Sequence, residues 1–312
     1  MFKQLLVPLD GSQLAEAALP VAAYLAPQFG ASVCLVHIIE KNAPKEIHGE
    51  RHLTDEEEAH TYLEGVAKRA FPPGLSVKRH VHTTETSNVA SSIVEHVGEL
   101  ASDLIVMCTH GHGGLRSLVF GTIAQQIIAV GVCPVLLIHP KGAGEAPALC
   151  CQNILIPLDG NPEHEHVIPI AAELAPIFSA AVHLVTAVHT RGTLSGERAA
   201  MSRLLPGTTS ALLDLAYQRA GDRLKRPMAL LQHAGVSVTT HIQRGDPAQV
   251  IARTAEEIKA DLIVLGTHGK AGMEAFWEGS ITPQIARQTQ VPMLLVRVRA
   301  AGQGQEDAQS KG

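Results

Sequence analysis

Residues 5–11 read Leu-Leu-Val-Pro-Leu-Asp-Gly, and residues 154–160 read Ile-Leu-Ile-Pro-Leu-Asp-Gly. Both are short apolar runs that end in a polar turn, a pattern typical of a strand that is buried on both faces. Residues 103–106 and 261–264 form a second matched pair, because both read Asp-Leu-Ile-Val. Matched segments in the same order indicate two copies of one domain.

The spacing of these segments defines the domain organisation. The offset between the copies is 149 residues at the first pair and 158 at the second, so copy 2 has nine extra residues, which lie within residues 191–227. A chain of 312 residues is long enough for two domains of ordinary size. We predict a first domain over residues 1–140, a linker over 141–150, a second domain over 151–299 and a disordered tail over 300–312.

Apolar runs alternate with helical patterns within each copy. Residues 33–39 and 103–108 are nearly continuous apolar runs, whereas residues 14–25 and 89–100 repeat apolar side chains at helical spacing. Alternating strands and helices predict the α/β class, with two tandem doubly wound (Rossmann-like) domains. Each domain is expected to be a mostly parallel five-stranded sheet with helices on both faces, and its ligands bind beyond the carboxyl ends of the strands.

Composition excludes several classes of protein. Hydrophobic residues make up 46% of the chain, which excludes wholesale disorder, and a net charge of −5 argues against nucleic-acid binding. No apolar run reaches the roughly 18 to 20 residues that span a bilayer, and the N-terminus does not read as a signal peptide. The five cysteines are odd in number and include no Cys-x2-Cys pair. We therefore expect a reduced, cytoplasmic protein without a membrane partner.

A glycine-containing loop follows the fourth predicted strand of each copy. Residues 266–280 read Gly-x2-Gly-x9-Gly-Ser, and residues 108–122 read Cys-x2-Gly-x9-Gly-Thr. Glycines allow backbone N–H groups to approach phosphate oxygens closely, and a helix N-terminus adds further donors. A Ser or Thr at the start of the helix offers a hydroxyl group as well. The two matched loops predict phosphate binding.

The loops, the two openings and the final apolar strands together resemble the universal stress protein family, with two such domains covering nearly the whole chain. The resemblance implies a site for ATP or another adenine nucleotide, alone or with Mg²⁺, in which Asp10 and Asp159 line the pocket and Ile38 and Ala187 lie beside the adenine. The predicted site of copy 1 comprises Pro8, Asp10, Ile38, Met107, Thr109, His110, Gly111, Gly121, Thr122 and Ile123. That of copy 2 comprises Pro157, Asp159, Ala187, Leu265, Gly266, His268, Gly269, Gly279, Ser280 and Ile281.

Two features of the predicted sites favour different copies: the glycines favour nucleotide binding in copy 2, and the loop charges favour it in copy 1. Cys108 replaces the first glycine of the motif in copy 1, which costs about 1 to 2 kcal/mol if that position requires a left-handed backbone. The loop of copy 2 instead carries Glu274 and Glu278, which oppose a triphosphate, whereas the loop of copy 1 carries histidines and Arg116. We expect both copies to bind nucleotide with unequal affinity. With an aromatic content of 3%, aliphatic strand ends are expected to hold the base.

The first functional hypothesis is a stress-response nucleotide sensor or regulator without a catalytic residue. An alternative is a slow ATPase or nucleotidyl-transfer enzyme, in which Asp10 or Asp159 holds Mg²⁺ or orients water, although no arginine clamp is evident near the loops. A third hypothesis is a protein-interaction module with vestigial sites. The resemblance also implies antiparallel pairing of residues 134–140 with 292–298, which makes the chain an intramolecular pseudo-dimer. A homodimer of the whole chain and the identity of a protein partner stay open.

Two further features receive simpler interpretations. His80 and His82 share one face of a predicted strand, but no third ligand is evident nearby, so we predict no metal site. Cys108 is interpreted as a small buried apolar side chain rather than a redox-active thiol.

Overall fold

The computed structural model describes residues 1–43, 46–47, 50–109, 122–130, 133–140, 149–268 and 281–298. The elements of copy 1 are, in chain order, β1 Gln4–Pro8, α1 Gln13–Glu16, α2 Leu19–Phe29, β2 Ser32–Glu40, β3 Glu46–Ile47, β4 Glu50–Arg51, α3 Glu56–Ala70, β5 Val77–Thr86, α4 Val89–Glu99, β6 Leu104–Cys108, α5 Thr122–Val130 and β7 Val135–Ile138. Those of copy 2 are β8 Asn153–Pro157, η1 Pro162–His166, α6 Val167–Phe178, β9 Ala181–Val188, η2 Arg191–Thr193, α7 Gly196–Leu204, α8 Pro206–His233, β10 Ser237–Arg244, α9 Pro247–Glu257, β11 Leu262–His268, α11 Thr282–Ala286 and β12 Met293–Val298.

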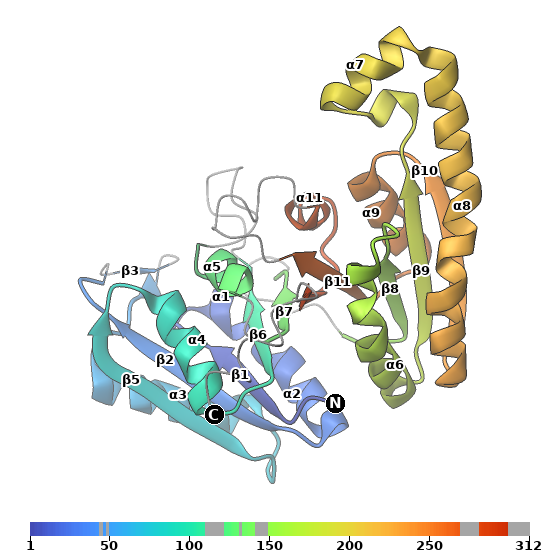
Figure 1. The fold of residues 1–312 in the computed structure, drawn as a ribbon. Coiled ribbons are helices and arrows are strands. Elements are labelled where there is room, and N and C mark those ends of the chain that lie inside the picture. Colours follow the sequence, from blue (N-terminus) through green and yellow to red (C-terminus); the bar gives the residue numbers. More distant parts are fainter. Residues whose placement is uncertain are drawn as a thin grey trace, which may run out of the picture.

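One ten-stranded sheet runs through both copies (Figure 1), in the order β10-β9-β8-β11-β12-β7-β6-β1-β2-β5. Neighbouring strands within each copy are parallel. Each copy therefore contributes five strands with doubly wound connections, which confirms the predicted fold class. The short strands β3 and β4 form a separate antiparallel pair beside copy 1.

Helices cover both faces of the sheet because successive strand residues point to opposite faces. In β1, Leu5 and Val7 belong to one apolar core and Leu6 to the other. The first core includes side chains of α2, α3, α6 and α8. The second includes side chains of α4, α5, α9 and α11. Strands buried on both faces explain why the sequence shows continuous apolar runs rather than alternation.

The Asp-Leu-Ile-Val repeat has a structural role. The Asp103 carboxylate accepts hydrogen bonds from the backbone N–H groups of Lys3 (2.7 Å) and Gln4 (3.0 Å), at the start of β1. Asp261 accepts the equivalent bonds from Gln152 (2.8 Å) and Asn153 (2.9 Å), at the start of β8. The aspartate of each copy thus satisfies backbone donors at the entry of a neighbouring strand, far from the carboxyl ends where ligands bind.

The copies meet along β7 and β12, which pair antiparallel with Leu137 opposite Met293 and Leu136 opposite Leu294. This is the strand pairing that the family resemblance implies. An aromatic contact adds to it, because Tyr24 stacks on Phe178 with ring centroids 5.9 Å apart. Continuous backbone pairing and side-chain packing therefore join the two copies, and the pairing covers two apolar strand edges.

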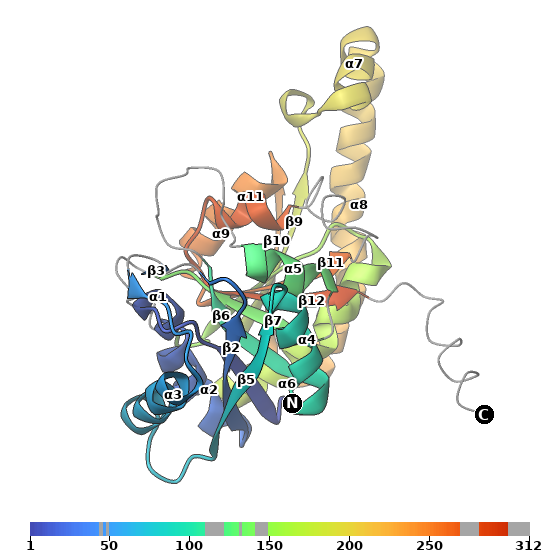
Figure 2. The ribbon, with the colours of Figure 1, turned by 90° about the vertical axis from the view of Figure 1, so that its left-hand side faces the viewer.

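The extra residues of copy 2 lengthen its helical layer. α8 has 28 residues, whereas its counterpart α3 has 15, and the additional helix α7 precedes it. Figure 2 shows α7 and the adjoining end of α8 projecting beyond the rest of the molecule. Although α8 is long, neither it nor any other helix in the described part of the chain is apolar enough to cross a bilayer.

His139 follows β7 at the junction and gives the fold a pH dependence. Its side chain is buried, and among the described residues neither ring nitrogen has a hydrogen-bond partner. Burial lowers the pKa of His139 to about 4, whereas an unfolded histidine titrates near about 6.5. As the pH falls, the unfolded chain takes up the proton first, so stability that is present above pH ~6.5 is lost between about 6.5 and 4.

We expect this one group to lower the free energy of unfolding by about 2 kcal/mol between pH 6.5 and 5, since each pH unit between the two pKa values contributes about 1.4 kcal/mol. Urea unfolding across this range measures the slope. His139→Leu is expected to flatten it, whereas His233→Leu, at an exposed position on α8, should leave it unchanged. Equal slopes for the wild type and His139→Leu would contradict the assignment.

Candidate functional site

The candidate site of copy 1 lies where the strand order reverses. β1 lies between β2 and β6: the chain continues from β1 to β2 and β5 on one side, and then crosses to β6 and β7 on the other side. Open α/β sheets bind ligands in the crevice beyond the carboxyl ends of such strands. Asp10 follows β1 at this edge, and Met107 stands near the end of β6. The structure thus brings residues distant in sequence together at the position where this class of sheet binds ligands.

A cavity of about 100 Å³ occupies this position. Five of the ten residues predicted for copy 1 line it, namely Pro8, Asp10, Ile38, Met107 and Ile123. Thr109 is buried elsewhere, and its backbone N–H donates to the Ile138 carbonyl (2.9 Å). Thr122 begins α5, but the structure does not describe its side chain. The predicted residues His110, Gly111 and Gly121 lie outside the described residues.

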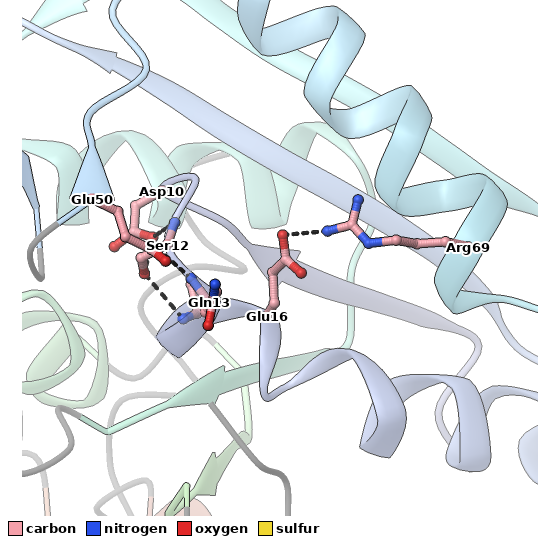
Figure 3. A network of polar contacts seen from close by, with 7 residues as sticks. Asp10, Ser12, Gln13, Glu16, Glu50 and Arg69 are labelled. Carbon is pink, nitrogen blue, oxygen red and sulfur yellow. Dashed lines mark hydrogen bonds and ion pairs between the residues drawn. The ribbon is translucent and has the colours of Figure 1, made fainter. Parts of the chain in front are cut away.

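The turn after β1 holds the Asp10 carboxylate (Figure 3). One of its oxygens, Oδ1, accepts hydrogen bonds from the Ser12 backbone N–H (2.9 Å) and from the Ser12 hydroxyl (2.6 Å). The same Ser12 oxygen caps α1 by accepting from the Ala15 backbone N–H (3.2 Å). Gly11 adopts a φ of +93°, and a Cβ there would lie 2.9 Å from the Leu53 side chain. The Asp-Gly-Ser sequence therefore fixes both the backbone turn and the position of the carboxylate.

Residues 50–53, which begin with β4, form part of the wall of the copy 1 cavity. Glu50 accepts a hydrogen bond from the Gln13 backbone N–H (2.7 Å) at the start of α1 (Figure 3). The buried His37 ring bridges β1 and this segment, with Nδ1 2.8 Å from the Leu9 carbonyl and Nε2 3.1 Å from the Leu53 carbonyl. The sequence offered one indication of this role, because His37 interrupts an otherwise apolar run. We call residues 50–53 the cover segment; its His52 lines the cavity.

Copy 2 contains a larger cavity of about 530 Å³. Two of its predicted residues, Asp159 and Ala187, line this cavity, at the carboxyl ends of β8 and β9. Four others are described but are not among the lining residues, namely Pro157, Leu265, Gly266 and Ile281. The backbone of His268 ends β11, but its side chain is not described, and Gly269, Gly279 and Ser280 lie outside the described residues. The greater part of both glycine-containing loops, residues 110–121 and 269–280, thus lies outside the described residues.

Helices α7 and α8 supply most of the remaining wall, and with it two cationic side chains. Arg198 of α7 and Arg223 of α8 line the same cavity as Asp159. Arg223 also passes over Gly160, where a Cβ would lie 2.7 Å from its Cδ atom. The sequence showed no arginine clamp near the glycine-containing loops; these two arginines come instead from α7 and α8. Both arginines lie in or near the extra segment of copy 2, and only the folding of α7 and α8 beside β9 brings them to Asp159.

Asp159 has a histidine partner. Its Oδ1 accepts from the Asn161 backbone N–H (2.9 Å) and lies 2.8 Å from His164 Nδ1. Burial acts to raise the pKa of the Asp159 carboxyl, but the hydrogen bonds from His164 and Asn161 outweigh it and hold the pKa below its ordinary value. The carboxylate is therefore ionised at neutral pH. His164 thus orients this group.

The structure also bears on Cys108 at the motif position. Burial, with a smaller contribution from the nearby Asp10 carboxylate, raises the pKa of the Cys108 thiol to about 12. Nucleophilic and redox chemistry requires the thiolate, which is scarce at neutral pH under these conditions. Cys108 therefore acts as an apolar wall of the cavity, in agreement with the simpler interpretation.

Comparison with known proteins adds the family to this geometry. A model of the universal stress protein family matches residues 1–139 and matches again over residues 151–297. The chain belongs to the universal stress protein family. It is a tandem member, with one match in each copy of the duplicated fold.

Some relatives match nearly the whole chain, and others match about half of it. Universal stress protein E of Escherichia coli (strain K12) is 24% identical over 318 residues, covering 95% of this chain and 94% of its own. A universal stress protein of Methanocaldococcus jannaschii is 29% identical over 148 residues, covering 47% of this chain and 82% of its own. The crystal structure of a universal stress protein from Archaeoglobus fulgidus covers 95% of this chain and 97% of its own, with a TM-score of 0.64 at 16% identity. This structural likeness supports the fold.

Proposed function

We propose that this universal stress protein binds ATP or another adenine nucleotide and acts as a stress-response nucleotide sensor or regulator. The observation that carries the proposal is the 530 Å³ cavity of copy 2, which combines Asp159 and Ala187 with Arg198 and Arg223. Ligand pockets of roughly 300–1,000 Å³ are typical for molecules of this size. Its position beyond the carboxyl ends of β8 and β9 is where such sheets bind ligands.

The lining residues suit the parts of a nucleotide. Aliphatic side chains such as Leu194 and Leu213, together with Ala187, offer an apolar surface for the base. The ionised Asp159 is a hydrogen-bond acceptor for ribose hydroxyl groups. The guanidinium groups of Arg198 and Arg223 are suited to phosphate oxygens, with which they form charge-assisted hydrogen bonds. These residues would recognise the ligand by shape and charge rather than by aromatic stacking.

We further propose that copy 2 is the tighter of two unequal sites. The 100 Å³ cavity of copy 1 is smaller than the volume that a nucleotide requires. We propose that the cover segment, held by Glu50 and by the Leu53 carbonyl, moves when a nucleotide enters. That movement reduces the observed affinity, because binding energy is used to populate the open state.

Asp159→Ala is expected to weaken ATP binding by about tenfold, since a hydrogen bond to a charged group contributes about 1.5–3 kcal/mol and each 1.4 kcal/mol is tenfold. Asp10→Ala should affect the weaker site alone. Isothermal titration calorimetry on the full chain measures both. Asp222→Ala is the matched control, because this exposed aspartate of α8 pairs with Lys225 and does not line the cavity. A stoichiometry of zero nucleotides per chain would contradict the proposal.

The same titration, repeated with Mg²⁺ and with EDTA, shows whether ATP binds together with Mg²⁺ or alone. Mg²⁺ prefers carboxylate and phosphate oxygens, and Asp10 and Asp159 are the lining carboxylates common to both copies. If Mg²⁺ joins the nucleotide at these residues, the ATP affinity falls in EDTA, and the fall is smaller in Asp159→Ala. An affinity that is the same in Mg²⁺ and in EDTA indicates that the nucleotide binds alone.

Turnover separates the sensor from the enzyme alternative. If the protein is a slow ATPase or nucleotidyl-transfer enzyme, Asp10→Ala or Asp159→Ala abolishes product formation at saturating ATP. If it is a sensor, the bound nucleotide is recovered unchanged after many dissociation lifetimes. Absence of both binding and turnover favours a protein-interaction module with vestigial sites.

The proposed unit of function is the whole chain. We propose that residues 1–140 and 151–299 form two domains whose β7–β12 pairing makes one chain an intramolecular pseudo-dimer. All five cysteines are free thiols, which supports a reducing compartment such as the cytoplasm. Analytical ultracentrifugation decides whether whole chains pair further into a homodimer.

A further inference from the structure

Three histidines of copy 1 converge on the face of the sheet opposite α3. His80 and His82 lie two residues apart on β5, so their side chains point to the same face. α4 packs on that face and contributes His96. One ring nitrogen from each of the three lies within 4.8 Å of the others. β5 is the edge strand of the sheet, so two of the three side chains are only partly buried and the cluster is open to solvent on one side.

A hydrogen bond within α4 fixes the tautomer and the orientation of the His96 ring. Its ring is 3% exposed, and its Nδ1 lies 2.6 Å from the Ser92 carbonyl one turn earlier. A carbonyl oxygen only accepts hydrogen bonds, so Nδ1 carries the proton and donates it. In the neutral ring Nε2 then carries a lone pair, and this atom lies 2.6 Å from His80 Nε2. Histidine ligands of metals commonly have this second hydrogen bond, which fixes the tautomer and the ring orientation.

A fourth ligand is within reach. Glu99 stands one turn after His96 on α4, and its Oε2 lies 3.8 Å from His96 Nε2. The Glu99 side chain is 67% exposed, so it can turn toward or away from the cluster. Three imidazole nitrogens with a carboxylate or water match the ligand sets of four-coordinate zinc.

We propose that His80, His82 and His96 bind a divalent transition metal of the zinc class, with Glu99 or water as the fourth ligand. Tetrahedral coordination at Zn–N distances of about 2.0–2.1 Å separates two ligand nitrogens by about 3.4 Å. The His80–His96 separation must therefore widen by about 0.8 Å. His80 is half-buried on an edge strand, so a small side-chain rotation supplies this change while His96 stays fixed by Ser92.

Copy 2 provides an internal comparison. Val33 pairs with Val77 in copy 1, and the equivalent Val182 pairs with Val238 in copy 2. By this register the counterparts of His80 and His82 are His241 and Gln243. Counted from the helix N-caps, the counterpart of His96 is Thr254, whose hydroxyl donates to the Val250 carbonyl. Two of the three ligands are thus replaced, and within the described residues the three-histidine cluster belongs to copy 1.

The metal would act on the wall of the copy 1 cavity. α4 contributes Val89 and Ile93 to that cavity, within two helical turns before His96. A metal bound between β5 and α4 ties this helix to the sheet. We therefore expect metal binding to stabilise copy 1 and to reduce the mobility of one side of its cavity.

The test uses the full chain after EDTA treatment and removal of the chelator, with ZnCl₂ alone as the probe. Calorimetry is expected to give one high-affinity ion per chain. Co²⁺ in the same site should show the intense visible absorption of four-coordinate cobalt. His82→Gln, which installs the copy 2 residue, should lower the Zn²⁺ affinity by about a hundredfold and abolish that absorption. His241→Gln in copy 2 is the matched control and should change neither.

Zn²⁺ binding at other histidines is the outcome that would overturn the proposal. With 17 histidines in the chain, Zn²⁺ can bind loosely to surface residues. An unchanged affinity in His82→Gln, or a loss caused by His241→Gln, would assign the ion to such residues and overturn the proposal. Circular dichroism without metal verifies that His82→Gln is folded. If it is not, His80→Gln replaces it, and saturating Zn²⁺ must raise the Tm of the wild type but not of that variant.

Discussion

Leu137→Lys is expected to lower the free energy of unfolding by about 4 kcal/mol. Leu137 lies on β7 opposite Met293 of β12, is fully buried and belongs to the core that both copies share. An ammonium group there has no water and must either lose its proton or force the strands apart. Buried unpaired charges are among the few single changes that reach this magnitude.

Chemical denaturation with tryptophan-independent detection, such as circular dichroism, measures this loss. Because the change is at the junction, we also expect the two copies to unfold in separate transitions rather than together. Leu204→Lys is the matched control, since Leu204 of α7 is 75% exposed and the same substitution there should change stability by less than about 0.5 kcal/mol. Equal stabilities for the two variants would be incompatible with β7–β12 docking in solution.

Ala216→Trp is expected to reduce the ATP affinity of copy 2 by about a hundredfold, equivalent to about 2.7 kcal/mol. Ala216 is partly buried on α8 and lines the 530 Å³ cavity, so an indole ring at this position occupies space that the nucleotide requires. The substitution leaves the charged lining residues in place. The predicted loss therefore tests the position of the ligand rather than its electrostatic attraction.

Ala211→Trp on the same helix is the control, because Ala211 is exposed and does not line the cavity. Its affinity for ATP should equal that of the wild type. Ala15→Trp, which fills the small cavity of copy 1, should remove only the weaker site. If Ala216→Trp binds ATP normally while remaining folded, the nucleotide lies outside this cavity, and the proposed location is wrong even if binding itself is real.

Much of the candidate site was predictable because it lies at strand ends. Pro8, Asp10, Ile38 and Met107 each stand at or near the carboxyl end of an apolar run, and parallel strands place all such ends at one edge. The prediction was less complete in copy 2, where Leu265 and Ile281 do not line the larger cavity. In copy 2 the cavity lies between β9 and the additional helices, whereas the cavity of copy 1 lies at the ends of β1, β2 and β6. No local sequence pattern indicates where a long helix such as α8 will pack.

The histidine cluster illustrates the same limit. The alternation of β5 placed His80 and His82 on one face, yet the third member is 14 residues further along the chain, on a helix. His96 falls on the apolar stripe of α4, where a buried histidine cannot be distinguished by spacing from any other core side chain. Only the crossing of α4 over β5 makes it a neighbour.

The sequence by itself determined the duplication, the α/β class and the ends of the strands, because these follow from periodicity and repetition along the chain. The pairing of residues 134–140 with 292–298 was implied by the family resemblance and not by any pattern in the chain. The tertiary structure decided which side chains share a cavity. Arg198 and Arg223 line the same cavity as Asp159, and His96 contacts His80, through helix packing between segments that have no pattern in common. Local periodicity fixes which face of an element is buried, whereas the angle and position at which two elements pack depend on the whole core.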